Sequence, residues 1–288
     1  MAKFNMNISL ANIAKKRFMK DKVASIALLA MILIILIAVL APFLSPHDPL
    51  EMNYSGTLQS PSGNHFFGTD EFGRDVFSRI LYGTRYALII GLGVVLLESA
   101  IGVTLGILAG YFGGIVDGII MRIVDIMLSI PSLILAIALA GILGGGLKNT
   151  IIAIGIIMWG QFARLVRGET LLIMEEPYIE AAKSLGISDL HIIFKHILPN
   201  ALSPLIVYTT LSMPSAILIS ASLSFLGVGV QPPTPEWGLM VSEGRDLIGS
   251  AWWISTFPGL AIMMISLTLN VVGDALRDAL DPKLEGRI

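Results

Sequence analysis

Long apolar stretches alternate with shorter polar, charged or Gly/Pro-rich breaks along this chain of 288 residues. Six stretches come close to, or exceed, the roughly 20 apolar residues that an α-helix needs to cross a bilayer. In chain order they are 23–44, 86–111, 126–143, 150–166, 201–226 and 252–272. The pattern predicts an all-α, polytopic membrane protein with six transmembrane helices.

Charged side chains inside or beside these stretches lower the free energy gained by membrane insertion, so each has to be considered. Glu98 is the single charge in the second stretch, and its insertion cost of about 3 kcal/mol is smaller than the gain from the surrounding Leu, Ile, Val and Phe residues. The fourth stretch, 150–166, is the weakest because it is short and carries Arg164 near its end, although a long basic side chain can extend to the interface. At the entry to the third stretch, Arg122 and Asp125 stand three residues apart, and we expect a local ion pair.

The overall composition agrees with this pattern and excludes other classes of protein. Hydrophobic residues make up 55% and charged residues 14% of the chain, whereas an ordinary soluble domain carries about a quarter charged residues. A formal net charge of -2 leaves no basic excess that could neutralise a phosphate backbone, so nucleic acid is not an expected partner. The chain has no cysteine, which excludes disulfides, thiolate metal sites and a thiol nucleophile.

The distribution of Lys and Arg predicts the orientation in the membrane, because short basic loops stay on the cytoplasmic side. With the N-terminal tail inside, fourteen of the 19 basic residues fall on cytoplasmic segments and five on external ones. We therefore expect a multi-pass protein of the cell membrane, surrounded by lipid, with both termini in the cytoplasm. The first stretch is longer than the apolar part of a signal peptide and no small-residue cleavage site follows it, so we expect it to remain as an anchor.

The stretches divide the chain into five segments and leave no room for a separate soluble domain. We expect a cytoplasmic tail, a first transmembrane helix, an external loop, a core of five membrane helices with a cytoplasmic loop at 167–200, and a second cytoplasmic tail. The bounds of the five segments are 1–22, 23–44, 45–85, 86–272 and 273–288. In the external loop Phe72, Val76 and Ile80 recur at helical spacing, which predicts an interfacial helix on the outer surface.

Residue patterns for catalysis or ligand binding are scarce. The nearest approach to a phosphate-binding loop, 144–150, has Leu147 where the pattern requires Gly before the Lys, so nucleotide binding is not expected. The histidines share no metal-binding motif, because the closest pair is five residues apart and lacks the intervening Glu of a zinc helix. They are His47, His65, His191 and His196. We expect no catalytic residue, no cofactor and no metal.

Two features of the second stretch point to helix packing or to transport. Gly102, Gly106 and Gly110 repeat every fourth residue, so they line one face and allow another helix to approach closely. Glu98 is an intramembrane carboxylate, which is a candidate for a substrate or proton pathway. A hydrogen-bonded carboxyl that serves helix packing beside Ser99 explains Glu98 equally well.

The polar segment between the fourth and fifth stretches carries the most information about function. Pro177 suits a first helical turn, residues 178–185 can continue the helix, and Gly186 can end it in the left-handed conformation. The helix formers near its centre are Glu180, Ala181 and Ala182. Ser188 can then cap a second helix that runs through His196. A short helix with adjacent alanines and a glycine stop presents a small-residue surface suited to a groove on a partner protein, and the alternative is a plain surface loop.

At these residues the chain resembles the permease subunits of ATP-binding cassette (ABC) importers. Their cytoplasmic loop carries Glu-Ala-Ala, three residues, Gly, nine residues, and then Ile-x-Leu-Pro. The matching positions here are Glu180, Ala181, Ala182, Gly186, Leu198 and Pro199. His196 stands where the family pattern has Ile, so the resemblance rests chiefly on the Glu-Ala-Ala and Gly part.

The resemblance extends over nearly the whole chain. The segments that carry it are the basic N-terminal tail, residues 41–49, Gly68 to Arg74, Ser224 to Gly229 and Gly273 to Leu284. They are similar to the dipeptide, oligopeptide and nickel branch of the importer family.

The resemblance implies a type I importer permease fold and a transport subunit that does not itself hydrolyse ATP. The implied partners are a second, related permease, two cytoplasmic ABC ATPases and an external substrate-binding protein. The helix from Glu180 to Gly186 would be the coupling helix, and the glycine face at Gly106 is expected to contact the partner permease.

Two alternatives remain at this point. A nickel or other small-solute permease belongs to the same family. A secondary transporter would need ion-coupling groups at the midplane, for which Glu98 is the only candidate. The sequence leaves open the substrate, the identity of the partner permease and the residues of the substrate pathway.

Overall fold

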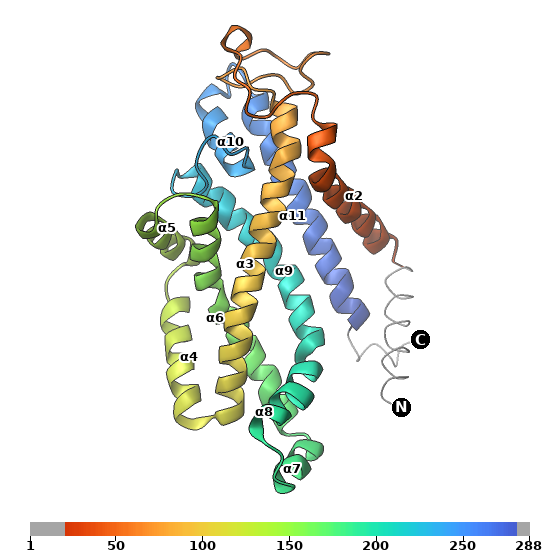
Figure 1. Ribbon diagram of the computed structural model, residues 1–288, viewed down its shortest axis with the longest axis vertical. Helices are drawn as coiled ribbons and strands as arrows, with labels where there is room; N and C mark the ends of the chain where they lie inside the picture. The colour runs from red at the N-terminus through yellow and green to blue at the C-terminus, as the bar shows by residue number, and fades with distance from the viewer. Residues whose placement is uncertain (1–20, 281–288) are drawn as a thin grey trace.

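The predicted spans form long helices that run side by side in an elongated bundle (Figure 1). The computed structural model describes residues 21–280, so most of the N-terminal tail and the end of the C-terminal tail lie outside the described residues. Across residues 21–280 the chain is helical, with connecting loops and no β-strand. The five longest helices are α2 (Lys22–Leu44), α3 (Val76–Phe112), α6 (Leu147–Met174), α9 (Leu198–Phe225) and α11 (Trp253–Leu280).

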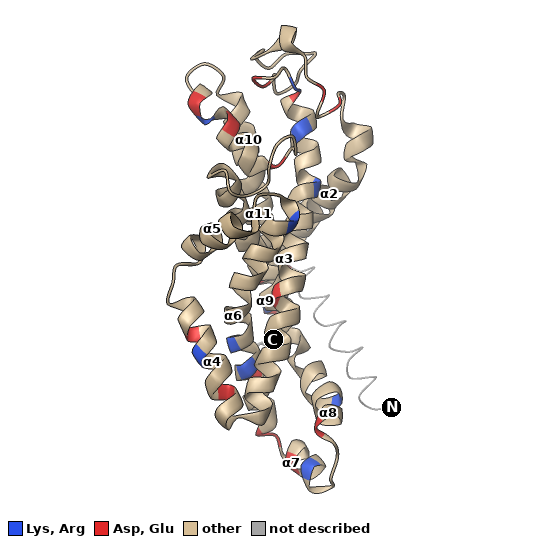
Figure 2. Cartoon of the chain, turned by 60° about the vertical axis from the view of Figure 1, so that its left-hand side comes forward, with Lys and Arg blue, Asp and Glu red and all other residues tan. Residues whose placement is uncertain are grey.

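Each long helix contains an apolar window that can cross a membrane, when α9 is taken together with the short helical turns before it. Two further helices, α4 (Gly114–Leu128) and α5 (Ser132–Leu143), pass the same test only as a pair. The described residues therefore contain five spans, or six if the bent pair is one span. Charged side chains gather toward the two ends of the bundle, and the belt between them is mostly uncharged (Figure 2). The protein is a multi-pass membrane protein.

The third span is not the single helix that the sequence predicted. It consists of two helices bent by 93° at a short break. α4 ends at Leu128, and Pro131 stands directly before α5. Proline has no backbone N–H and disfavours helical geometry at the residue before it, so the helix cannot continue through this point. The unbroken hydrophobicity of 126–143 concealed the bend, although Pro131 marks its place in the sequence.

The loop 45–75 contains no separate interfacial helix, contrary to the expectation. Val76 and Ile80 belong instead to the first turns of α3, whereas Phe72 stays in the loop. Asp75 starts the helix, because its carboxylate accepts a hydrogen bond from a backbone N–H of the first turn. No helix-breaking residue follows, so the amphipathic turns continue directly into the second span.

The Gly102, Gly106 and Gly110 series lies where α3 packs against α6, which is the most extensive helix contact of the described chain. A Cβ atom at these three positions would come within 2.7, 2.6 and 2.7 Å of atoms of α6. Such distances are shorter than van der Waals contact, so the absence of side chains is what lets the two helices approach. The contact lies within one chain, which corrects the expectation that this glycine face meets a partner permease.

Two ion pairs fasten α4 to α6. Arg164 pairs with Asp125, and Arg167 pairs with Asp117 through two hydrogen bonds. The ion pair expected between Arg122 and Asp125 does not form, because α6 runs beside α4 and offers Asp125 a guanidinium from another helix. Local spacing in the sequence could not indicate that competing partner.

The two ends of the bundle have different structures (Figure 1). One end carries the loop 45–75 together with α10 (Trp237–Gly244), and the opposite end carries α7 (Pro177–Ser184) and α8 (Asp189–Ile192). The remaining short turns are η1 (Tyr54–Gly56), η2 (Ile193–Ile197), which is a π-helical turn, and η3 (Arg245–Leu247).

Candidate functional site

The short helix α7 follows α6 and precedes α8 in the chain, and it lies at the end of the bundle farthest from the loop 45–75 (Figure 1). Pro177 occupies its first position, where the missing N–H would have no intrahelical partner in any case. The three residues Glu180, Ala181 and Ala182 follow as good helix formers. The sequence prediction of a helix that begins at Pro177 is confirmed, and this helix ends at Ser184.

Gly186 ends this helix in the left-handed conformation, with a φ of +73°, as the sequence predicted. Its N–H donates to the carbonyl of Lys183 at 2.9 Å, and the N–H of Ile187 donates to the carbonyl of Ala182 at 3.2 Å. No atom lies within 4 Å of the place where a Cβ of Gly186 would stand. The backbone conformation, and not crowding, is therefore what favours glycine here.

The sequence predicted that the second helix of this segment ends at His196. In the structure the helix continues past His196 into the fifth span. Ser188 occupies the N-cap position of α8, although its side chain makes no capping hydrogen bond. The π-helical turn η2 then joins α8 to α9 without a break. Pro199 lies just beyond this turn, and the wider π geometry accommodates a residue that has no N–H to donate.

The two alanines of α7 face different sides of the helix. Ala182 and Ile179 are buried, at 6% and 1% exposure, in an apolar cluster with residues of α3, α6 and α9. Glu180 and Ala181 are exposed on the outer side. The expectation that both alanines form one small-residue surface is therefore wrong, because helical rotation turns only Ala181 outward.

Polar contacts tie this end of the molecule to the end of α3. The hydroxyl of Tyr111 donates to Asp189 Oδ1 at 2.6 Å. The ammonium of Lys183 lies 5.1 Å from the centre of the Tyr111 ring, which is within the range of a cation–π contact. Because Tyr111 belongs to α3, a displacement of α7 or α8 would act on a membrane-spanning helix.

A second set of contacts links α7 to the start of α9. Asn200 donates from Nδ2 to the carbonyl of His196 at 2.6 Å and to the hydroxyl oxygen of Tyr178 at 3.2 Å. Partial burial and then the charge of Glu176 raise the pKa of the Tyr178 hydroxyl above its ordinary value. Leu198 is half-buried and Pro199 is exposed at the same junction.

Three large apolar side chains near α7 are exposed, and the sequence interpretation did not single them out. Leu185, Leu190 and Phe194 expose 80%, 68% and 65% of their surface. Large apolar side chains left outside a folded core commonly mark a contact surface. The sequence carried no clear signal for them, because other apolar residues are frequent in the same segment.

Glu98 lies within the bundle, away from α7, and is fully buried. It accepts a hydrogen bond from Ser212 Oγ on α9, while its second carboxylate oxygen has no partner among the described residues. Ser99, which the sequence suggested as a neighbour for packing, makes no side-chain hydrogen bond within residues 21–280. The structure thus brings Glu98 to the contact of α3 with α9.

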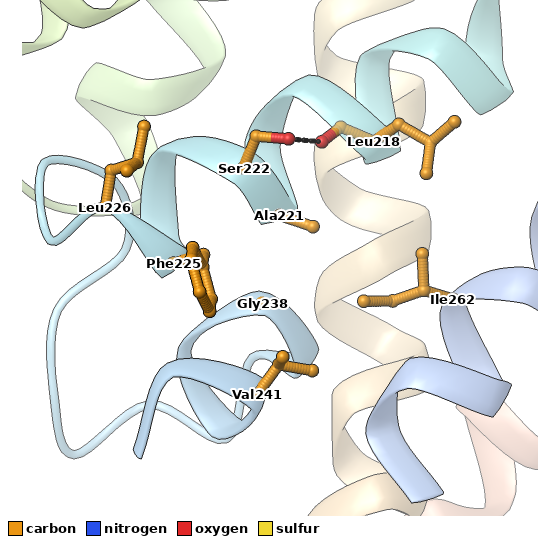
Figure 3. Close-up of a pocket in the computed structure, with 8 residues that line it drawn as sticks. All are labelled: Leu218, Ala221, Ser222, Phe225, Leu226, Gly238, Val241 and Ile262. Carbon is orange, nitrogen blue, oxygen red and sulfur yellow. Dashed lines mark hydrogen bonds between the residues drawn. The ribbon is translucent and has the colours of Figure 1, made fainter. Parts of the chain in front are cut away.

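A shallow groove opens near the end of α9, beside α10 and α11 (Figure 3). Its volume is about 290 Å³, and the residues that line it are Leu218, Ala221, Ser222, Phe225, Leu226, Gly238, Val241 and Ile262. The one hydroxyl among them, from Ser222, already donates to the carbonyl of Leu218 at 2.8 Å. The lining offers no charged group that could hold an ion or a phosphate.

This fold also occurs in a solved transporter structure, and the sequence matches two family models. A solved structure of the MetNI methionine ABC transporter in an inward-facing conformation has a TM-score of 0.56 to this chain. The alignment covers 70% of this chain and 96% of that chain at 21% sequence identity. Residues 102–286 match the family described as binding-protein-dependent transport system inner membrane component. Residues 9–61 match the N-terminal TM domain of oligopeptide transport permease C. The fold and the family match together define the class, which is the type I ABC importer permeases.

Three relatives that are named as transport permeases support the same class. The dipeptide transport system permease protein of Alkalihalophilus pseudofirmus is 49% identical over 94% of this chain and 90% of its own length. The di/tripeptide transport system permease protein of Pseudomonas aeruginosa is 46% identical over 93% of this chain and 90% of its own. The glutathione transport system permease protein of Escherichia coli is 44% identical over 94% of this chain and 90% of its own length.

This chain belongs to the family of binding-protein-dependent transport system inner membrane components. It is a permease subunit of an ABC importer, and ATP hydrolysis belongs to a separate subunit of such a system.

Proposed function

We propose that this permease moves dipeptides or oligopeptides across the cell membrane. The observation that carries the substrate class is 49% identity, over 94% of the chain, to a permease named for dipeptide transport. Relatives named for di/tripeptide and glutathione transport support the same class, because all three names describe short peptides. In this proposal the chain pairs with a second, related permease, two cytoplasmic ATPases supply energy, and an external binding protein delivers the peptide.

The end of the bundle that carries α7 is, in the same proposal, the docking site for one ATPase. Glu180 and Ala181 are exposed on α7, and the exposed side chain of Leu185 extends the surface. The opposite side of α7 is anchored by Ile179 in the apolar cluster, and Asp189 is bonded to Tyr111 of α3. A push on the outer side of α7 would therefore be transmitted to the spans, as alternating access requires.

The orientation of the chain in the membrane follows from the assignment of the α7 end as the ATPase docking site. The α7 end faces the cytoplasm together with both termini, and the loop 45–75 with α10 faces outward. Fourteen basic residues on the cytoplasmic segments against five outside support this orientation. The position of α7 and the loop 45–75 at opposite ends of the bundle agrees with it (Figure 1).

Transport in reconstituted vesicles tests the substrate class. The permease pair and its ATPases are placed in proteoliposomes with the binding protein outside, and uptake of a labelled dipeptide and of Ni²⁺ is measured with and without internal ATP. We expect ATP-dependent uptake of the dipeptide and none of Ni²⁺. Uptake of Ni²⁺ alone would replace the peptide proposal by the nickel alternative.

A further inference from the structure

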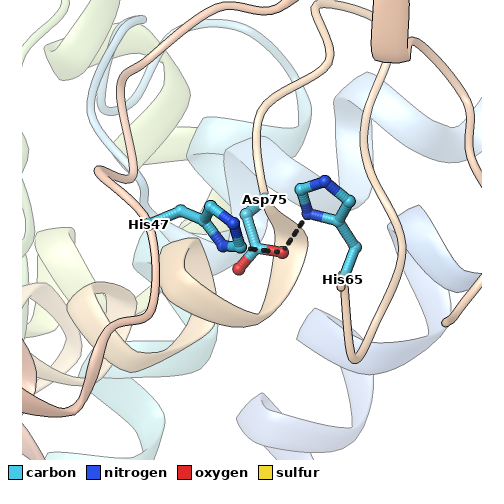
Figure 4. Close-up of side chains that lie close together, drawn as sticks. All are labelled: His47, His65 and Asp75. Atoms are coloured by element: carbon cyan, nitrogen blue, oxygen red, sulfur yellow. Dashed lines mark hydrogen bonds and ion pairs between the residues drawn. The ribbon is translucent and has the colours of Figure 1, made fainter. Parts of the chain in front are cut away.

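Three side chains from separate segments meet at the end of the molecule that carries the loop 45–75 (Figure 4). His47 follows α2, His65 lies further along the loop, and Asp75 caps the start of α3. The imidazole rings of His47 and His65 are stacked, with their centroids 4.7 Å apart, and the Asp75 carboxylate lies beside both (Figure 4). Asp75 is almost fully buried, whereas the side chain of His47 is 38% exposed.

The distances between the polar atoms suit a small metal ion. His65 Nδ1 lies 2.9 Å and His47 Nδ1 lies 3.8 Å from Asp75 Oδ1. Each of the three residues offers one ligand atom, and these atoms all lie within 4.8 Å of one another. With zinc–ligand bonds of about 2.0 to 2.1 Å, neighbouring ligands of a tetrahedral ion stand about 3.3 Å apart. The two measured nitrogen–oxygen distances bracket that value.

One of these three ligand atoms has no hydrogen-bond partner among the described residues. His65 can donate to Asp75 Oδ1, but His47 Nδ1 is buried and has no hydrogen-bond partner among residues 21–280. Stacking on His65 accounts for the position of the His47 ring but leaves its Nδ1 atom without a partner. A buried polar atom without a partner costs free energy. An ion bound by both nitrogens and by Oδ1 would satisfy all three atoms.

The surroundings of Asp75 hold this carboxylate in position. Its other oxygen, Oδ2, accepts hydrogen bonds from the N–H of Ser78 at 2.8 Å and from the hydroxyl of Ser78 at 2.7 Å. The N–H of His47 donates to the same serine oxygen at 3.2 Å. Ser78 therefore fixes both Asp75 and the backbone of His47, as outer partners commonly do around metal ligands.

We propose that His47, His65 and Asp75 form a binding site for a divalent transition metal ion, and that Zn²⁺ is the ion that fits best. Two imidazoles and one carboxylate are ligands that zinc prefers, whereas Ca²⁺ and Mg²⁺ require mostly oxygen ligands. The ion would cross-link the end of α2, the loop and the first turn of α3, and would so hold the loop 45–75 in place. The site is independent of the proposed substrate.

Zinc binding to the assembled transporter tests the proposal. The complex is purified in detergent without a polyhistidine tag, treated with a chelator and dialysed against low micromolar Zn²⁺, and bound zinc is measured by mass spectrometry. The matched variants are His47→Ala and Asp75→Asn, since Asn preserves the helix cap while removing the charged ligand. His191→Ala at the α7 end is the control. Mg²⁺ in large excess serves as the competitor.

We expect the wild type and His191→Ala to bind one more zinc ion per copy of this chain than either site variant. The apparent affinity of His47→Ala should fall by at least about tenfold, and Mg²⁺ should not compete. His47 is partly exposed and lies in a loop, so this variant should keep the thermal unfolding temperature of the metal-free wild type. Equal zinc content in the wild type and His47→Ala, or no zinc in either, would overturn the proposal.

Discussion

Four charged side chains form a buried cluster where the loop 45–75 meets α10. Arg74 and Arg79 are 1% and 0% exposed, and both bind Asp70 and Glu243. Arg74 Nε lies 2.6 Å from Asp70 Oδ2, and Arg79 Nη1 lies 2.9 Å from Glu243 Oε2. Two positive and two negative groups balance in this cluster, so it fastens the loop to α10 without leaving a net buried charge.

Asp70→Asn should destabilise the protein strongly, because it leaves two buried guanidinium groups with one carboxylate. The expected loss is about 3 to 5 kcal/mol, which a lowered unfolding temperature of the purified protein would report. Asp246→Asn is the matched control, since Asp246 is 84% exposed in its pair with Arg245 and should contribute at most about 1 kcal/mol. Equal unfolding temperatures for both variants would contradict a stabilising role of the buried cluster.

Gly106→Leu should destabilise the chain itself. A Cβ at Gly106 would stand 2.6 Å from the carbonyl oxygen of Ala163, so a larger side chain must push α3 away from α6. Overpacking of this kind costs about 1 to 3 kcal/mol or more, and a thermal unfolding measurement on the isolated permease would show it.

Gly118→Leu serves as the control for Gly106→Leu, because Gly118 lies on an exposed part of α4 with no atom within 4 Å of its Cβ position. It should leave the unfolding temperature nearly unchanged. If Gly106→Leu instead kept full stability and lost only its association with the partner permease, the contact within the chain would not be the important one.

At the scale of single elements, α7 is held on one side and free on the other. Its inner side is anchored by Ile179, and its end depends on the left-handed conformation of Gly186. Its outer side offers Glu180 and Ala181. This division lets substitutions on the outer side change a contact with another protein without disturbing the bundle.

Gly186→Glu should leave membrane insertion intact and weaken ATPase docking and peptide uptake. The left-handed conformation costs a residue with a side chain about 1 kcal/mol or more, and the carboxylate adds charge at the proposed contact. Insertion depends on apolar spans with much larger free energies. The measurements are co-purification of the ATPase and uptake at matched permease levels.

Gly186→Asn is the control for this prediction, because Asn tolerates the left-handed conformation and carries no charge. It should keep most of the docking and uptake. Glu180→Lys should also weaken docking, since it reverses the charge of an exposed side chain on the same helix. Docking at the wild-type level in both Gly186→Glu and Glu180→Lys would exclude α7 as the coupling helix.

At the scale of the whole molecule, the orientation can be tested with single cysteines, because the chain has none of its own. Ser62 in the loop 45–75 and Ser184 at the end of α7 are both exposed. A membrane-impermeant thiol reagent should label Ser62→Cys from outside the cell, and Ser184→Cys only after the membrane is opened. The reverse pattern would invert the proposed topology.

The spans could be predicted from the sequence because insertion is a sum over about 20 neighbouring residues. The five long helices contain most of five of the six predicted stretches, and the third stretch, 126–143, is divided between α4 and α5. α3 begins ten residues earlier than 86–111 because Asp75 caps it. The end of α7 at Gly186 was predictable for the same reason, since a helix stop is local chemistry. The bend between α4 and α5 was missed because hydrophobicity alone does not distinguish a straight helix from two bent ones.

What the sequence by itself determined is therefore everything that depends on residues close together in the chain: the spans, the polar segment around Glu180 and the resemblance that its pattern carries. The tertiary structure decided which distant residues meet. It placed the glycine face of α3 on α6, gave Asp125 the partner Arg164, and brought His47 and His65 to Asp75. Contacts of this kind depend on how helices cross and loops return, and no local spacing encodes those distances.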